Sequence, residues 1–529
     1  MAAAVPCRMA SVSEELEIKY DADADVEVRS LLGALVESEE EVFLEDGDGV
    51  DARLEATYFD TVDHRLAGAH LTVRRRTGGA DEGWHLKVPG PDGARAEVRL
   101  PAGRAVKTVP AKLRRMVRVR TGGKALVPVA RITTDRTVWH LVEEAGRVLV
   151  EVADDRVVGQ RLRRPSSADR EPVDGSVQWR EVEIELVHGE RELLEAIDAR
   201  LRDLGLQVAS SRSKLARVLG DDMEAMPPGE KQELSPKSAS GGVVMAYLAG
   251  QVEQVLAYDP LVRVDRPDSV HKMRVASRRL RSALKTYQPL FDTEAVRPLR
   301  VELKWLAGRL GVARDAEVLR ERLGESVGAE GDHASGGPVA AGVDEEMSQA
   351  YRSAHDDLLV DLDADRYHRL VEALHALVST PPFTEPASGS AAEVLPARVA
   401  KTYKALKAEV KAAYAAPSGA ERSHHLHEAR KAAKRARYAA EALSEASGKE
   451  PAAFAGAMED LQEELGEHQD SVVMRERLLG LARCATTPAE GFTYGRLHAR
   501  EEARGERSQE RFGSAWKASS KKSLRRWFG

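Results

Sequence analysis

The sequence predicts a multidomain α+β protein, with an antiparallel β barrel and flanking helices followed by all-α helical bundles. Three observations support this prediction. Before residue 220 side-chain character alternates with a period of two, and after residue 240 apolar residues recur with a period of 3.6. A segment rich in Pro, Gly and Ser separates the two parts. The 529 residues are enough for several domains.

The composition narrows the class of protein. The chain carries 79 Lys and Arg residues against 86 Asp and Glu residues. This balance excludes a uniformly basic nucleic-acid coat but allows local basic patches. The two cysteines, Cys7 and Cys484, lie far apart and predict neither a disulfide framework nor a zinc knuckle. Because no apolar run approaches the roughly 20 residues that span a bilayer, and no secretory signal is recognisable, we expect a cytoplasmic protein without membrane contact.

Residues 11–220 are predicted to form the first domain, and residues 221–240 the linker that follows it. Two helical stretches, DVEVRSLLGALV and GERELLEAIDARLRDLGL, flank a series of strands. Because the alternation in these strands is carried by charge, they are expected to close into a barrel with a polar interior. The strand segments, which alternate and are separated by turn residues, are RLEATYFDT, HLTVRRR, GWHLKV, RAEVRL, RTVWHLV, RVLVEVADD and QWREVEIELV.

Charged side chains occupy one face of nearly every predicted strand. In SEELEIKY, Glu15, Glu17 and Lys19 share a face, because alternate residues of a strand point to the same side. In REVEIELV, three glutamates do the same. A one-residue register shift exchanges the faces of Asp154 and Asp155, so the sequence leaves open which of them faces inward. The remaining charged candidates are Arg74, Arg76, Lys87, Arg95, Arg131, Arg136, Glu181, Glu183, Glu185 and Lys214.

Charged strand faces have two interpretations. On a single antiparallel strand such a face is commonly just solvated. If every strand turns its charges into a barrel, the buried ions need partners. Phosphate oxygens suit the basic groups, because guanidinium forks match phosphate geometry, and Mg²⁺ or Mn²⁺ suits the carboxylates. The barrel is therefore predicted to hold a metal ion and a phosphate chain.

These residues resemble the CYTH domain of the triphosphate tunnel metalloenzymes. Glu15-x-Glu17-x-Lys19 is similar to the ExExK signature, and TYFDT, VRRR, HLK, RAE, ADD, VEIEL and SRSK follow in the family's order. The resemblance implies an eight-stranded antiparallel tunnel, with Glu15, Glu17 and Lys19 as the catalytic residues. It implies metal ligands at Glu15, Glu17, Glu183, Glu185 and Asp154 or Asp155. It implies phosphate contacts at Lys19, Arg74, Arg76, Lys87, Arg95, Arg131, Arg136 and Lys214.

Several activities are known in this family. We expect metal-dependent hydrolysis of inorganic triphosphate with Mg²⁺ or Mn²⁺, by in-line attack of a metal-associated water. Hydrolysis of thiamine triphosphate and adenylate cyclase activity are alternatives. The cyclase members resemble each other in a His-Phe pair before the first glutamate, where this chain has Met9 and Ala10. A tunnel that binds polyphosphate without hydrolysing it is a further alternative.

Residues 241–529 contain a basic stripe that occurs twice. In VHKMRVASRRLRSALKTY, helical spacing places basic residues on one face and apolar residues on the other. LHEARKAAKRARYAAEAL repeats the pattern 156 residues later, and RLGVARD is echoed by ELGEHQD. These echoes predict an internal twofold repeat with halves of about 241–378 and 394–529. The segment 379–393 between them is predicted to be a second linker.

The second half resembles the CHAD domain, a helical domain that often follows CYTH. The resemblance implies binding of inorganic polyphosphate in a basic central channel, which would bring the protein to polyphosphate granules. The stripes have few aromatic residues to stack on bases, which disfavours nucleic acid as the ligand. The oligomeric state is left open. The residues implied to bind polyphosphate are His271, Arg274, Arg278, Arg281, Lys285, His427, Arg430, Lys434 and Arg437.

Overall fold

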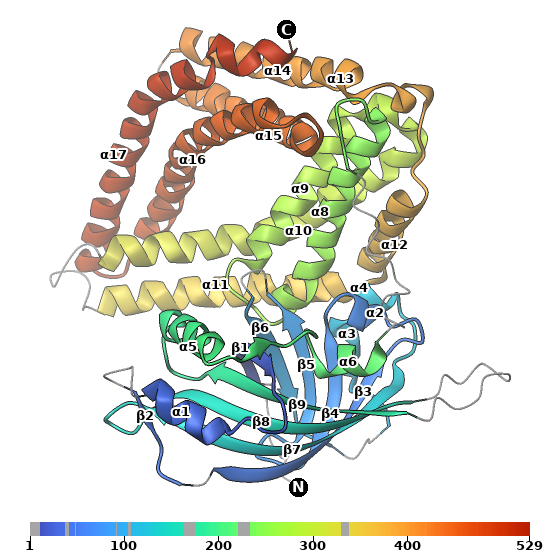
Figure 1. Cartoon of the computed structure of the whole chain (residues 1–529). Helices are drawn as coiled ribbons and strands as arrows, with labels where there is room; N and C mark the ends of the chain where they lie inside the picture. Colours follow the sequence, from blue (N-terminus) through green and yellow to red (C-terminus); the bar gives the residue numbers. More distant parts are fainter. Residues whose placement is uncertain are drawn as a thin grey trace, which may run out of the picture. The chain divides into compact units, whose positions relative to one another are not determined.

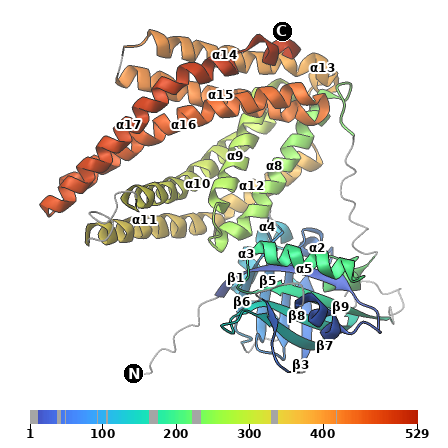
Figure 2. The ribbon, with the colours of Figure 1, turned by 60° about the vertical axis from the view of Figure 1, so that its left-hand side comes forward.

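The computed structural model describes nine segments of the chain. The chain divides into two compact units, Met1–Glu230 with Asp259–Arg266 and Lys231–Tyr258 with Pro267–Gly529 (Figures 1 and 2). Met9, Ala10 and residues 221–232 of the predicted linker lie outside the described residues. The described residues are 11–36, 42–47, 49–90, 93–103, 107–162, 175–220, 233–328, 338–417 and 419–528.

Eight antiparallel strands of the first unit close into a barrel. They are β1 (Ser11–Asp21), β3 (Val50–Asp60), β4 (Thr72–Thr77), β5 (Gly83–Pro89), β6 (Arg95–Leu100), β7 (Val127–Val142), β8 (Val148–Arg161) and β9 (Ser176–Leu186). Their order is β1–β6–β5–β4–β3–β7–β8–β9, and β9 pairs with β1 to complete the ring. Short strands β2 (Phe43–Leu44) and β10 (Gln207–Val208) pair with β7 and β1. The predicted eight-stranded antiparallel barrel is confirmed.

The barrel carries apolar side chains on its outer face, where helices cover them (Figure 1). Leu35 of α1 and Ile197 of α5 belong to one buried cluster with Val152 of β8 and Ile184 of β9. Burying this outer apolar face drives the packing of the helices on the sheet, and it leaves the alternate, charged residues to point inward. The two predicted flanking helices are present. The helices of this unit are α1 (Val28–Val36), α2 (Arg65–Gly68), α3 (Ala111–Met116), α4 (Arg118–Thr121), α5 (Arg191–Asp203) and α6 (Lys214–Leu219).

The second unit is helical throughout its described residues, apart from turns and isolated bridges. Its long helices fall into two groups, α8–α12 and α14–α17, and the boundaries of the repeat halves stay a prediction. None of the described helices combines the length and apolarity needed to cross a bilayer. The helices are α8 (Ser240–Arg263), α9 (Ser269–Thr286), α10 (Thr293–Gly328), α11 (Pro338–Asp363), α12 (Asp365–Ser379), α13 (Ala391–Val394), α14 (Pro396–Ala415), α15 (Ala420–Ser447), α16 (Lys449–Cys484) and α17 (Pro488–Ser519).

The segment 379–393 is ordered, which corrects the prediction of a second linker. It contains a 3₁₀ turn, η2 (Glu385–Ser388), and leads into α13. The Phe383 ring lies 5.6 Å from the Phe291 ring, and the N–H of Thr384 donates to the Leu290 carbonyl at 3.0 Å. The Pro and Gly content indicated a linker, but packing of this aromatic ring holds the segment against the end of α9.

Candidate active site and anion-binding cluster

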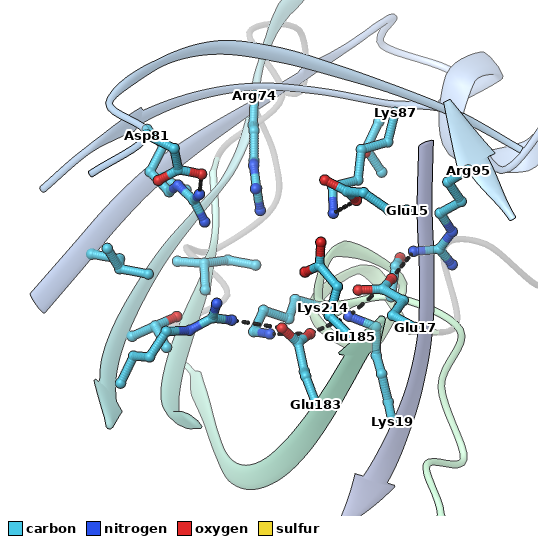
Figure 3. Close-up of a pocket in the computed structure, with 18 of the residues that line it drawn as sticks. Glu15, Glu17, Lys19, Arg74, Asp81, Lys87, Arg95, Glu183, Glu185 and Lys214 are labelled. Carbon is cyan, nitrogen blue, oxygen red and sulfur yellow. Dashed lines mark hydrogen bonds and ion pairs between the residues drawn. The ribbon is translucent and has the colours of Figure 1, made fainter. Parts of the chain in front are cut away.

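The barrel encloses a cavity of about 530 Å³ to which every strand contributes side chains (Figure 3). Its wall is charged because the inward face of the barrel carries the alternate residues that the sequence singled out. Most of the predicted site residues of the first domain lie here. The charged lining residues are Glu15, Glu17, Lys19, Arg74, Arg76, Asp81, Lys87, Arg95, Arg99, Arg136, Glu151, Glu183, Glu185, Arg212 and Lys214.

Strand register aligns three glutamates in a row across β1, β9 and β8. Glu17 lies opposite Glu185, and Glu185 lies opposite Glu151. Directly opposed residues on antiparallel strands have Cβ atoms roughly 5 Å apart, so these glutamates start from adjacent positions on one wall. We call Glu17, Glu185 and Glu151 the acidic row. Glu15, the next inward residue of β1, lies beside it.

Glu185 is the least neutralised member of the acidic row. Glu17 accepts from Arg95 at 2.6 Å, and Glu15 pairs with Lys87. In the described part of the chain no basic side chain makes an ion pair or hydrogen bond with Glu185. Burial, and then the charge of Glu15, raise the pKa of Glu185 to about 7 against the opposing effect of Lys87.

The acidic row fits a divalent cation. A carboxylate that is buried beside other carboxylates, and whose pKa is raised for that reason, needs an added positive charge to stay ionised. Carboxylate oxygens are also the ligands that Mg²⁺ and Mn²⁺ prefer. Burial opposes ionisation of Glu17, but Lys19 and Lys87 outweigh it and lower the pKa of Glu17 to about 2. Glu17 is therefore an ionised neighbour for a cation at Glu185.

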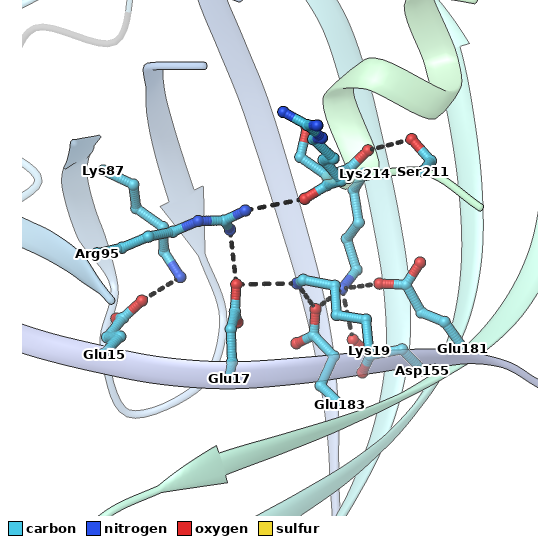
Figure 4. Close-up of polar contacts among 12 residues, drawn as sticks. Glu15, Glu17, Lys19, Lys87, Arg95, Asp155, Glu181, Glu183, Ser211 and Lys214 are labelled. Atoms are coloured by element: carbon cyan, nitrogen blue, oxygen red, sulfur yellow. Dashed lines mark hydrogen bonds and ion pairs between the residues drawn. The ribbon is translucent and has the colours of Figure 1, made fainter. Parts of the chain in front are cut away.

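A second group of carboxylates surrounds Lys214 (Figure 4). The Lys214 Nζ lies 2.8 Å from an Asp155 oxygen and 2.7 Å from a Glu181 oxygen. It also lies 2.7 Å from an oxygen of Glu183. Oxygens of these three acids fall within 4.8 Å of one another, close enough for one metal ion. Because the ammonium group already sits among them, we call Asp155, Glu181 and Glu183 the lysine socket.

The start of α6 explains why Lys214 reaches this position. Ser213 caps the helix, since its Oγ accepts from the N–H of Ala216 at 3.1 Å. This cap fixes Lys214 as the first helical residue, and its side chain extends into the cavity. Burial opposes the charge on Lys214, but Asp155 and Glu183 outweigh burial and hold its pKa well above the usual value. The lysine socket is thus a closed arrangement of opposite charges.

Arginines from β4 and β7 line another part of the cavity. Arg136 donates at 2.7 Å to Asp155 and at 2.6 Å to Glu183. Arg76 pairs with Asp81. Burial, and then the charges of Arg74 and Arg136, lower the pKa of Arg76 to about 9. A guanidinium group whose pKa is lowered by burial and by neighbouring guanidinium groups favours an anionic ligand beside it.

Three predicted site residues are absent from the cavity wall, Arg131, Asp154 and Asp155, and the first two lie on the outer side of the barrel. Arg131 is exposed and absent from the cavity wall, because its spacing of five from Arg136 puts the two side chains on opposite faces of β7. Asp154 accepts from Arg180 at 2.8 and 2.9 Å on the outer side of the barrel, whereas Asp155 faces inward. The structure therefore corrects the phosphate assignment of Arg131 and the metal assignment of Asp154.

Several polar groups of the lumen had no role assigned from the sequence. Tyr58 lines the cavity and accepts from Arg74 at 3.5 Å, so its hydroxyl hydrogen can be donated to a ligand. His85 is buried, with Nδ1 2.9 Å from Glu97 and Nε2 2.8 Å from the Asp81 carbonyl. Period-two alternation in TYFDT and GWHLKV predicts that these two side chains point inward. They were not singled out from the sequence, because only charged residues of these strands were selected.

In the helical unit, α9 and α15 pack against each other (Figure 1), and basic residues of their two stripes affect one another's charge. Burial, and then the charges of Arg430 and Arg278, lower the pKa of Lys434 to about 6. Burial also lowers the pKa of Arg278, and Arg274 adds to this effect. These residues from both repeat halves therefore form one group of like charge. We call Arg274, Arg278, Arg430 and Lys434 the central cluster.

The echoed motifs RLGVARD and ELGEHQD support this cluster in the same way in each half. Arg274 lies 3.0 Å from Asp315, and Arg430 lies 3.5 Å from Asp470. A Cβ added at the motif glycine would lie 3.3 Å from the Arg274 Nη2 and 3.0 Å from the Arg430 Nη2, respectively. The glycines that leave room for these guanidinium groups are Gly311 and Gly466.

The two stripe histidines have similar electrostatic surroundings. Burial lowers the pKa of His271, with a further contribution from Arg314 against the opposing effect of Asp268. Burial also lowers the pKa of His427, followed by the charge of Lys431. Both imidazoles are therefore mainly neutral at pH 7, so they would contact a ligand as neutral hydrogen-bonding groups rather than as cations.

Comparisons with known proteins identify the two parts of the chain. The CYTH domain model matches residues 15–218, and the CHAD domain model matches residues 246–479. Two uncharacterized proteins from strains of Mycobacterium tuberculosis are each 38% identical over 475 residues, which cover 88% of this chain and 89% of theirs.

Solved structures that cover about half of the chain were also found. PptA from Streptomyces chartreusis is 23% identical with a TM-score of 0.45, covering 53% of this chain and 100% of its own. The CHAD domain from the plant Ricinus communis is 26% identical with a TM-score of 0.44, covering 54% and 93%. The two matched domain models and the extended similarity to the mycobacterial proteins show that the chain belongs to the family in which a CYTH domain is followed by a CHAD domain.

Proposed function

We propose that the barrel hydrolyses inorganic triphosphate, or a closely related triphosphate, with Mg²⁺ or Mn²⁺. The observation that carries this proposal is that one cavity holds both the under-neutralised acidic row and the arginines of β4 and β7. The acids fit a cation and the arginines fit phosphate oxygens, so the two together fit a metal-bound phosphate chain. Membership of the CYTH family supports a triphosphate substrate.

The side chains of the cavity have separable roles in this proposal. Glu15, Glu17 and Glu185 would hold the metal ion, which when bound neutralises phosphate charge and activates water. Arg74, Arg76 and Arg136 bind and orient the phosphate oxygens through paired N–H groups. Lys19 and Lys87, which lie among the glutamates, neutralise charge that develops on the leaving phosphate. Little covalent chemistry is asked of the protein beyond positioning and electrostatic stabilisation.

The cavity wall favours an inorganic phosphate chain over an organic triphosphate. Among the described lining residues, ring side chains are limited to Tyr58, His70 and His140. A pocket for a base or a thiazolium ring is commonly built from aromatic and apolar groups that stack on the ring. The uncharged part of the wall here consists mainly of small aliphatic residues on β3 and β7.

The test measures phosphate release from inorganic triphosphate by the full-length protein, with Mg²⁺, with Mn²⁺ and with a chelator. Arg136→Ala is expected to lower kcat/KM by roughly 100-fold or more, as loss of a preorganised charge contact does. Arg131→Ala, on the outer face of the same strand, is the matched control and should stay within about twofold. If no triphosphate shows metal-dependent turnover, the tunnel binds phosphate chains without hydrolysing them.

We further propose that the central cluster of the helical domain binds inorganic polyphosphate and so localises the enzyme. Three arginines and Lys434, drawn together from α9 and α15, fit a ligand of continuous negative charge. Binding of long polyphosphate and of single-stranded DNA by the full-length protein at two salt concentrations separates the two polyanions. Arg274→Ala combined with Arg430→Ala should weaken polyphosphate binding, and unchanged affinity would contradict the assignment.

Polyphosphate affinity is expected to rise as the pH falls from 8 to 6. Lys434 has a pKa of about 6 in the ligand-free protein, so it is mostly neutral at pH 8. Phosphate oxygens favour the ammonium form and raise this pKa, so binding takes up a proton above pH 6. One linked proton changes the affinity by at most about tenfold per pH unit, and the gain from Lys434 levels off below pH 6.

Calorimetry in two buffers of different ionisation enthalpy measures this proton uptake directly. Lys434→Met should abolish the uptake at pH 7. Lys272→Met, at an exposed position paired with Asp268, is the control. Equal proton uptake by wild type and Lys434→Met would contradict the prediction.

A further inference from the structure

The two repeat halves carry opposite charges at one end of the basic stripe. An offset of 156 residues relates Arg281 to Arg437, and it relates Lys285 of α9 to Glu441 of α15. The offset of 155 that relates the echoed motifs places Lys304 of α10 at the position of Glu459 of α16. At both of these positions the first half therefore has a lysine where the second half has a glutamate.

In the second half these acids neutralise the end of the stripe. Glu441 accepts from Arg437 at 2.7 Å, from Arg279 at 3.0 Å and from the Tyr247 hydroxyl at 3.0 Å. Glu459 lies 2.7 Å from the other side of the Arg437 guanidinium. Arg437, which the sequence placed among the polyphosphate ligands, thus has two carboxylate partners within the domain.

In the first half the equivalent position lacks an acid. Burial, and then the charges of Arg435 and Arg300, lower the pKa of Lys285. Burial also lowers the pKa of Arg281, followed by the charge of Arg300. Within the described residues no carboxylate forms an ion pair with any of these four basic groups.

Arg300 adds a separate sign that a partner is missing. Its Nη1 donates to Gln288 at 3.3 Å, but its Nε is buried without a hydrogen-bond partner among the described residues. A buried donor left in this state costs free energy unless a ligand accepts from it. The Lys285 side chain is exposed, so this group of cations can be reached from solvent.

We propose that Arg281, Lys285, Arg300 and Arg435 form an anion site for a phosphate group of inorganic polyphosphate. In the second half, Glu441 and Glu459 neutralise the equivalent position, so that no phosphate binds there. The inference rests on the proposed polyphosphate binding by the central cluster. Polyphosphate would then leave the central cluster on one side, toward the C-terminal end of α9.

The spacing of the stripe on α9 supports a continuous path. Arg274, Arg278, Arg281 and Lys285 are separated by four, three and four residues, so they lie on one face of the helix. At 1.5 Å per residue the path covers about 16 Å along the axis. On α15 the same face ends in Glu441, which would repel a phosphate chain.

The test compares two charge reversals on α9 in the full-length protein. Lys285→Glu introduces the residue of the second half at the proposed site. Lys272→Glu is the matched control, because it makes the same change of charge at an exposed position. As at Lys285, the equivalent residue of the second half is an acid, Glu428. Affinity for long polyphosphate, measured at two salt concentrations, is expected to fall about tenfold or more for Lys285→Glu relative to Lys272→Glu. Arg435→Ala, from the facing helix, should weaken binding in the same direction.

The outcomes separate this inference from the proposed function. Equal affinities of the Lys285→Glu and Lys272→Glu proteins, within about twofold, would overturn the anion site. If Arg274→Ala combined with Arg430→Ala also has no effect, the polyphosphate-binding function itself fails. A loss of binding in that double variant together with an unaffected Lys285→Glu variant would overturn only the one-sided path. Circular dichroism and thermal melting check that each variant is folded.

Discussion

Glu185→Gln is expected to lower the rate of metal-dependent triphosphate hydrolysis by roughly 100-fold or more, while the fold becomes no less stable. Loss of a ligand that holds a catalytic metal removes both its binding and its orientation. The substitution breaks no ion pair among the described residues, because Glu185 has none there. Activity with Mg²⁺ and Mn²⁺ and the free energy of unfolding in chelator are the two measurements.

The sign of the stability change follows from the raised pKa of Glu185. A carboxyl group whose pKa is about 7 in the folded protein and near 4.5 in the unfolded chain destabilises the fold above pH 4.5, and fully above pH 7. Removing its charge should therefore stabilise the metal-free protein by roughly 1–3 kcal/mol at pH 8 and by less at pH 5. Glu143→Gln, in an exposed ion pair with Arg147, is the control.

Adding metal should reverse the order of stability. A cation that binds only the folded state stabilises the wild type by mass action, and the Glu185→Gln protein has lost one of the ligands for it. Wild type is expected to gain more in melting temperature with Mn²⁺ than the variant. A variant that keeps full activity, or that gains as much from Mn²⁺ as the wild type, would contradict the assignment of the metal to the acidic row.

Period-two alternation explains how much of the barrel could be predicted from the sequence. Once the apolar face of each strand packs against a covering helix, the charged face must point inward, and this placed Glu15, Glu17 and Arg74 correctly. The same rule, applied strictly, separates Arg131 from Arg136, because their spacing is odd. It could not decide between Asp154 and Asp155, since that choice depends on the register with β9.

The charge pairing inside the cavity could not be predicted from the sequence. Glu183 and Glu185 are equivalent in sequence pattern, yet Glu183 pairs with Lys19 and Lys214, whereas no basic residue in the described segments pairs with Glu185. The difference arises because α6 returns to the barrel and inserts Lys214 beside Glu183, a contact between residues far apart in the chain. In the helical domain, by contrast, the repeat itself revealed both halves of the central cluster.

Lys214→Met is expected to lower the free energy of unfolding at pH 8 by about 3–5 kcal/mol, because it leaves buried carboxylates without their central partner. Burial opposes ionisation of Asp155, but Lys214 and Arg136 outweigh it and lower its pKa. Without Lys214 the pKa values of the lysine socket rise, so the loss of stability should be largest above about pH 5 and smaller below it, where the acids take up protons. Urea unfolding at pH 8 and pH 5 measures both values.

The lysine socket can also be tested with metal, because removal of the ammonium group would leave three carboxylates whose oxygens lie within 4.8 Å of one another. In a Glu185→Gln background, which weakens the acidic row, Mn²⁺ should raise the melting temperature of Lys214→Met much more than that of the protein that retains Lys214. Lys124→Met, which breaks an exposed pair with Asp63, is the control in the same background; it should cost at most about 1 kcal/mol and leave the response to Mn²⁺ unchanged. If Lys214→Met left both the stability and the Mn²⁺ response of the Glu185→Gln protein unchanged, Lys214 would not be the counter-ion of these acids.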